Sequence, residues 1–137
     1  MPRASPTKST EDSKSPTAIV QLATFLEERA ATVHALEAEA EALIHDKKDQ
    51  AGYAAKMREK AELLADLAED AEPLVNALEP VLAKAAGERL ASFSGSAAMS
   101  LNVGSVFFMS ALLYPDEHKP GDPNNLDKYA AEVRGWA

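Results

Sequence analysis

The sequence has 137 residues, of which 46% are hydrophobic, 26% are charged and none is cysteine. A chain of this length forms one domain and buries enough surface to fold without disulfides or structural metals. The absence of cysteine excludes disulfides, thiolate zinc sites, iron–sulfur clusters and thiol nucleophiles. The formal net charge of −8 argues against nucleic-acid binding as the main task.

Residues 1–16 are rich in Ser, Thr, Pro and Lys, and contain no large apolar side chain after Met1. Such a segment buries too little surface to offset its ordering entropy. It is therefore predicted to be a disordered tail that precedes one folded domain at 17–137. The segment also lacks the apolar stretch of a secretory signal, so we expect a cytoplasmic protein.

The first helix is predicted to begin at Ser15-Pro16, where serine is a good N-cap and proline suits the first helical position. Apolar residues then recur at alternating steps of three and four from Ile19 to Leu43, with Arg29 at the one polar position of the series. A period near 3.5 residues keeps one helix face against a neighbour, as in a coiled coil. The helix should end at 46–48, with Asp49 capping an antiparallel second helix after a short turn.

The second helix shows the same apolar spacing from Ala54 to Ala85, without a slip at Pro73 or Pro80. Proline removes a backbone hydrogen bond and clashes with the preceding turn, so the helix must kink or restart at these positions. The unbroken spacing favours a kink or a nearly collinear restart over a sharp reversal. The sequence alone leaves open which of the two occurs.

The 26 residues from Leu90 to Pro115 include no charged residue and no histidine. With 26% of residues charged, the chance that a given window of this length lacks charge is about 0.0004. A helix that is apolar on all sides lies either at the centre of a protein or in lipid. We expect a central core helix here, with its small residues on the side nearest a neighbour: Ser92, Ser96, Ser100 and Gly104.

One alternative for the same segment is a helix buried in a dimer interface, or one that can be released to a membrane. Another is a membrane span, because Ala97 to Tyr114 comprises 18 residues and reaches the minimum spanning length. Asn102 near its middle and the lack of a flanking basic cluster argue against this alternative.

A turn-forming stretch at 115–125 precedes a short terminal helix, for which Asp122 or Asn125 is the expected cap. An apolar stripe with helical spacing follows: Leu126, Tyr129, Ala130 and Val133. Trp136 extends this stripe, so we expect it to dock onto the domain, with an exposed anchor for a partner as the alternative.

Residues that could support catalysis are sparse. The three histidines, His34, His45 and His118, lack the partners at short spacing that hydrolytic or metalloprotease motifs require. The weak candidates for a metal site are Glu37, Glu41 and His45, which recur at steps of four on one helix face. Solvated carboxylates are the preferred interpretation, so we expect no enzyme activity, no cofactor and no metal.

The sequence therefore predicts an all-α antiparallel bundle of about four main helices, with a short C-terminal helix and a disordered N-terminal tail. The expected function is non-catalytic interaction or assembly, in which a helix face recognises a protein partner or another copy of the chain. We expect no nucleic-acid partner. The residues expected to form the interaction face lie mainly on the first helix: Phe25, Leu26, Val33, Leu36, Ile44 and Trp136.

Two other functions stay open. One is a membrane-active protein whose apolar helix at 90–115 is sheltered until a trigger releases it. The other is a metal-binding helical bundle.

Overall fold

The computed structural model describes residues 6–137, with side chains from Pro16 onward, and every regular element in this part of the chain is a helix. The predicted all-α bundle is therefore confirmed. The helices are α1 (Pro6–Asp46), α2 (Gln50–Ala65), α3 (Leu67–Asn76), α4 (Pro80–Val103), α5 (Val106–Ala111) and α6 (Asn125–Arg134).

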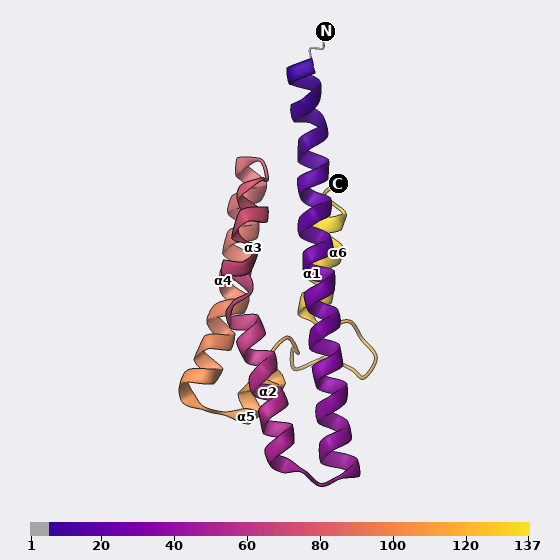
Figure 1. Cartoon of the computed structure of the whole chain (residues 1–137), viewed down its shortest axis with the longest axis vertical. Helices are drawn as coiled ribbons and strands as arrows, with labels where there is room; N and C mark the ends of the chain where they lie inside the picture. Colours follow the sequence, from indigo (N-terminus) through magenta and orange to yellow (C-terminus); the bar gives the residue numbers. More distant parts are fainter. Residues whose placement is uncertain (1–5) are drawn as a thin grey trace.

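The long helix α1 forms one side of the bundle, and the remaining chain folds back along it (Figure 1). Helices α2 and α3 follow one another alongside α1, and α4 returns antiparallel to them. After α5 the chain crosses back to place α6 beside α1. The main core lies between these helices and includes Leu22 and Leu26 of α1, Leu67 of α3, Leu90 of α4 and Leu126 of α6.

Helix α1 begins at Pro6, so the predicted start at Ser15-Pro16 is wrong and Pro16 lies inside the helix. Proline keeps a helical φ and removes one backbone hydrogen bond, which an exposed position tolerates. The predicted tail therefore overlaps α1 from residue 6 to residue 16. Its first five residues, and the side chains of residues 6–15, lie outside the described part of the chain.

The predicted turn after α1 is confirmed. Helix α1 ends at Asp46, and Asp49 is the N-cap of α2, where its Oδ1 accepts the N–H of Gly52 at 2.8 Å. Gly52 suits this cap because a Cβ at that position would lie 2.4 Å from Asp49 Oδ2. The chain then runs back along α1, as the short connection predicts.

The two prolines of the predicted second helix behave differently. Pro73 lies inside α3, but Pro80 is the first residue of α4, capped by Glu79 Oε1, which accepts the N–H of Leu82 at 2.8 Å. Between them the chain reverses direction (Figure 1), so the expected nearly collinear course through Pro80 is wrong. Leu78 at this reversal is buried in the same core as the helices it joins. Apolar spacing alone does not distinguish one continuous helix from two helices that face each other.

The charge-free segment from Leu90 to Pro115 is not a central core helix, so the prediction that its own neighbours enclose it is wrong. Helix α4 ends at Val103, and Gly104 follows with a left-handed φ of 67°. One face of α4 packs on α2 and α3 through Leu90, Phe93 and Ala97, whereas the place beside α1 is taken by α6. Of the expected small-residue side only Ser100 is buried; Ser92, Ser96 and Gly104 are exposed.

In the part of the chain that the structure describes, no helix combines the length and the apolar character that crossing a membrane requires. The candidate span at 97–114 is interrupted at Gly104, between α4 and α5.

The terminal helix is confirmed, but its cap is Asn124 instead of Asp122 or Asn125. Asn124 Oδ1 accepts the N–H of Asp127 at 2.8 Å, and Asp127 Oδ2 accepts the N–H of Asn124 at 3.0 Å. This reciprocal pair satisfies two backbone donors at once, which explains why position 124 prevails.

The predicted stripe of α6 is buried, and Trp136 packs edge-on against Tyr129 with ring centroids 6.2 Å apart. The expected docking of Trp136 is therefore confirmed.

Candidate functional site

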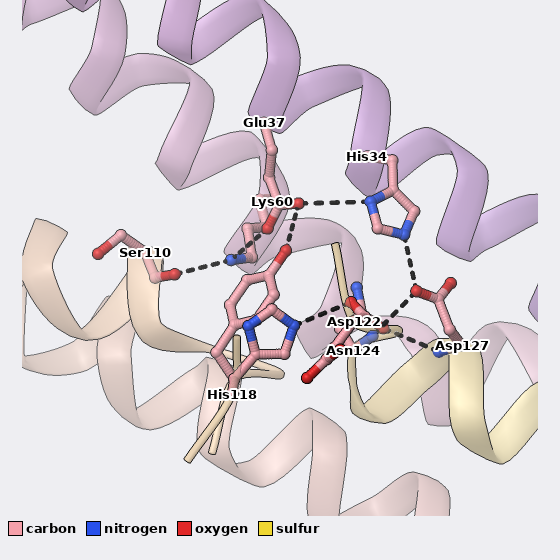
Figure 2. Close-up of polar contacts among 9 residues, drawn as sticks. His34, Glu37, Lys60, Ser110, His118, Asp122, Asn124 and Asp127 are labelled. Atoms are coloured by element: carbon pink, nitrogen blue, oxygen red, sulfur yellow. Dashed lines mark hydrogen bonds and ion pairs between the residues drawn. The ribbon is translucent and has the colours of Figure 1, made fainter. Parts of the chain in front are cut away.

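Polar side chains from α1, α2, α6 and the segment between α5 and α6 meet in one cluster (Figure 2). Glu37 lies at its centre, and we call the group the Glu37 cluster. Its members are His34, Glu37, Lys60, Tyr114, Asn124 and Asp127.

Lys60 is the most buried charge of the described residues, with a side chain that is 0% exposed. Its Nζ lies 2.9 Å from Glu37 Oε2 and donates to the carbonyl oxygen of Ser110 at 3.1 Å. Burial lowers the pKa of Lys60, and the neighbouring carboxylate of Glu37 opposes that shift. The ammonium group thus joins three helices, since Glu37 belongs to α1, Lys60 to α2 and Ser110 to α5.

The second oxygen of Glu37 is also engaged. Tyr114 donates its hydroxyl to Glu37 Oε1 at 2.6 Å, and burial, reinforced by this carboxylate, raises the pKa of Tyr114. His34 Nδ1 lies 3.7 Å from the same oxygen, while its Nε2 lies 2.8 Å from Asp127 Oδ2. These contacts fasten the segment after α5 and the start of α6 to α1.

A cavity of about 320 Å³ adjoins the Glu37 cluster. It is lined by Glu37, Glu41, Tyr53, Met57, Ser110, Tyr114 and His118. Both carboxylate oxygens of Glu37 already have partners, and His118 Nε2 lies 2.9 Å from the carbonyl oxygen of Asp122. These contacts place Glu37 in a network that holds Lys60 and Tyr114 against α1.

The three weak metal candidates, Glu37, Glu41 and His45, do not converge on one point. His45 Nε2 pairs with Glu41 Oε1 at 2.9 Å on the exposed side of α1, while Glu37 contacts Lys60. Among the residues that the structure describes, no group of three or more histidine or acidic side chains is arranged to hold a metal ion.

The expected interaction face on the first helix is mostly enclosed by the chain itself. Leu26, Val33 and Leu36 are buried, so they have no free surface to present to a partner. Phe25 is half-buried beneath the guanidinium of Arg29, which lies 4.4 Å from the ring centroid. The two remaining candidates, Ile44 and Trp136, are also half-buried.

Exposed apolar side chains instead gather on α4 and α5. We call this surface the α4–α5 face; its large members are Met99 (65% exposed), Val103 (57%), Phe107 (73%) and Phe108 (53%). The rings of Phe107 and Phe108 contact each other with centroids 6.0 Å apart. The turn between α4 and α5 lies beside α2, toward the same end of the molecule as the turn between α1 and α2 (Figure 1).

Sequence reasoning missed both Lys60 and the α4–α5 face, although each had a signal. Lys60 belongs to a helical stripe with Met57, Ala61 and Leu64, so a charge stands among the residues of a buried face. For the α4–α5 face the signal was the lack of charge from Leu90 to Pro115, which is equally compatible with a buried helix and with an exposed apolar face.

Comparison of the chain with protein-family models, curated proteins and solved structures finds no match in any of the three.

Proposed function

We propose that this protein is a non-catalytic interaction or assembly protein that recognises its partner, or another copy of the chain, through the α4–α5 face. The observation that carries this proposal is the outward position of four large apolar side chains: Met99, Val103, Phe107 and Phe108. The proposal keeps the function expected from the sequence but moves the recognition surface from the first helix to α4 and α5.

The size and chemistry of the α4–α5 face support this proposal. Taking about 150 to 250 Å² for a whole aromatic side chain, Phe107 and Phe108 together expose roughly 200 to 300 Å². With Met99 and Val103 the face reaches the size at which exposed apolar surface usually marks a binding site. The buried centres of protein interfaces are rich in aromatic residues and Met and poor in charge, and this face shares that composition.

Hydrogen bonds between α4, α5 and the neighbouring helices hold the backbone beneath the α4–α5 face, which also favours a role in recognition. Lys60 donates to the carbonyl oxygen of Ser110 near the end of α5, and Ser94 of α4 is hydrogen-bonded to the backbone of Leu64 and Ala68. A surface held in this way loses little conformational entropy when a partner binds, which improves affinity.

A membrane-active function is the second candidate, because two exposed phenylalanines are also suited to a lipid interface. Interfacial binding usually needs basic residues beside the apolar ones, and the sequence on the C-terminal side of the segment supplies Asp116 and Glu117 instead. The protein partner is therefore the better proposal. The cytoplasmic location expected from the sequence stays a prediction.

Site-specific photo-crosslinking in the source cell tests this function. A photoreactive amino acid replaces Val103 on the α4–α5 face or, as control, Val81, which is 74% exposed at the other end of α4. We expect protein adducts at position 103 and few at position 81. Equal adducts at both positions, or lipid adducts alone at position 103, would contradict the proposal.

A further inference from the structure

We propose that the α4–α5 face is covered by a second copy of this chain, in a two-fold dimer in which Phe107 of each copy inserts into the hollow between α4 and α5 of the other. This inference rests on the proposed function and specifies its partner.

The α4–α5 face carries both a projecting side chain and a hollow to receive it. Phe107 is its most exposed large residue. Beside it lies a hollow of about 270 Å³, lined by Ser96, Met99, Ser100, Phe108, Ala111 and Leu112. A cavity of about 150 Å³ is enough to hold a benzene ring, so the hollow has room for a phenylalanine side chain.

Phe107 does not line the hollow of its own copy, whereas Phe108, whose ring contacts that of Phe107, forms one of its walls. A projecting ring and a hollow on one surface are self-complementary when two copies meet about a two-fold axis, since each ring enters the other hollow. The contact closes on itself and yields a dimer instead of an open chain.

The charges of the molecule favour a second copy over other occupants. The formal net charge is −8, so two copies repel each other wherever charged surfaces meet. The α4–α5 face is the exception, because from Leu90 to Pro115 the sequence contains no charged residue. A neutral aromatic surface pairs best with another neutral aromatic surface, since no charge is then buried without a partner, and each copy of the chain presents such a surface.

The available area fits a dimer of modest affinity. A standard interface buries about 800 Å² on each partner, and the two phenylalanines supply roughly a third of that. Further area comes from Met99 and Val103 and from the smaller exposed residues on the same side of α4, Ser92 and Ser96. The small side chains among them allow two α4 helices to approach closely.

Sedimentation velocity on the full chain between about 1 µM and 1 mM tests the dimer. We expect a monomer–dimer equilibrium that added salt strengthens, because salt screens the repulsion between two acidic copies. Phe107→Asp should weaken the dimer about 30-fold or more, since it places a charge in a dry interface. Val81→Asp makes the same change in charge on an exposed part of α4 outside the face, and should leave the equilibrium unchanged.

Met99→Glu places a charge on the α4 part of the same face and tests the same monomer–dimer equilibrium. Circular dichroism checks that each variant keeps the helical content of the parent chain. A wild-type chain that stays monomeric throughout, or a Phe107→Asp variant that dimerises as well as Val81→Asp, would overturn the dimer. If the chain is monomeric but position 103 crosslinks to a different protein, the dimer fails and the proposed function stands. If position 103 crosslinks only to lipid, both fail.

Discussion

The hydroxyl of Ser94 on α4 accepts a hydrogen bond at 3.0 Å from the backbone N–H of Ala68 on α3. The same hydroxyl donates to the carbonyl oxygen of Leu64 at 2.9 Å. In an uninterrupted helix the N–H of residue 68 would donate directly to the carbonyl of residue 64. Ser94 therefore replaces one helical hydrogen bond at the junction between α2 and α3, and a side chain inserted in this way is a recognised cause of helix bending.

Replacing Ser94 by alanine should lower the free energy of unfolding by about 1 to 2 kcal/mol, because the N–H of Ala68 loses its acceptor and the carbonyl of Leu64 loses one of its donors in a half-buried place. Urea denaturation measures this change. Ser92→Ala is the matched control, since Ser92 lies exposed on the same helix and gains the same helix propensity from alanine. Ser92→Ala should change stability by less than about 0.5 kcal/mol. Equal effects at both positions would show that the Ser94 hydroxyl does not hold the junction.

Removing Glu37 should destabilise the fold more than removing Lys60. Glu37→Ala leaves the fully buried ammonium of Lys60 without its anionic partner, which should cost about 3 kcal/mol or more. Lys60→Met should cost less, because Glu37 keeps its hydrogen bond from Tyr114 and is partly in contact with solvent.

The double variant Glu37→Gln, Lys60→Met should recover most of the loss seen in Glu37→Ala, because it leaves no buried charge. Urea denaturation of the three variants at neutral pH, compared with the parent chain, checks this order. If Glu37→Ala cost no more than Lys60→Met, the buried ammonium would not depend on Glu37.

Tyr129 should make the fold sensitive to alkali. Burial raises the pKa of Tyr129 to about 12, with Glu132 adding to the shift and Arg89 opposing it, against 10.0 for an ordinary tyrosine. The unfolded chain therefore loses this proton first as pH rises. The stabilisation is complete below pH 10 and falls by about 2 to 3 kcal/mol as pH rises to 12. Tyr114, whose pKa is also raised, adds to the same loss.

Tyr129→Phe should reduce this alkaline loss while leaving stability at pH 7 nearly unchanged. The Tyr129 hydroxyl is buried and has no hydrogen-bond partner among the described residues, so its removal breaks no contact there. Urea denaturation at pH 8, 10 and 11 measures the difference between the two chains. Parallel pH profiles for both would refute the role assigned to Tyr129.

Arg134 should determine how firmly the C-terminus is held. Its Nε and Nη2 lie 2.7 and 2.9 Å from the two carboxylate oxygens of Glu27, and Nη2 also donates to Thr24 Oγ1 at 2.9 Å. Lysine cannot reproduce this forked geometry. Arg134→Lys should therefore increase acrylamide quenching of Trp136, the only tryptophan of the chain. Lys128→Arg, a similar exchange at an exposed position of α6, is the control and should not alter the quenching.

Local patterns in the sequence were sufficient to place most helices. The spacing of apolar residues in α1 and α6, and the Asp49 cap of α2, depend on residues within a few positions of one another. These features follow from backbone geometry and hydrogen bonding within one or two turns. A neighbouring helix does not change them, so they could be predicted without the fold.

The tertiary structure decided which surfaces are covered. Apolar spacing is the same whether a helix continues at Pro80 or reverses there, and only packing against the core selects the reversal. The absence of charge in a segment does not show how many neighbouring helices enclose it. Only the tertiary structure shows that Phe107 is exposed. Lys60 is buried because Glu37 and the Ser110 carbonyl, both distant in sequence, offset the cost of removing its charge from water.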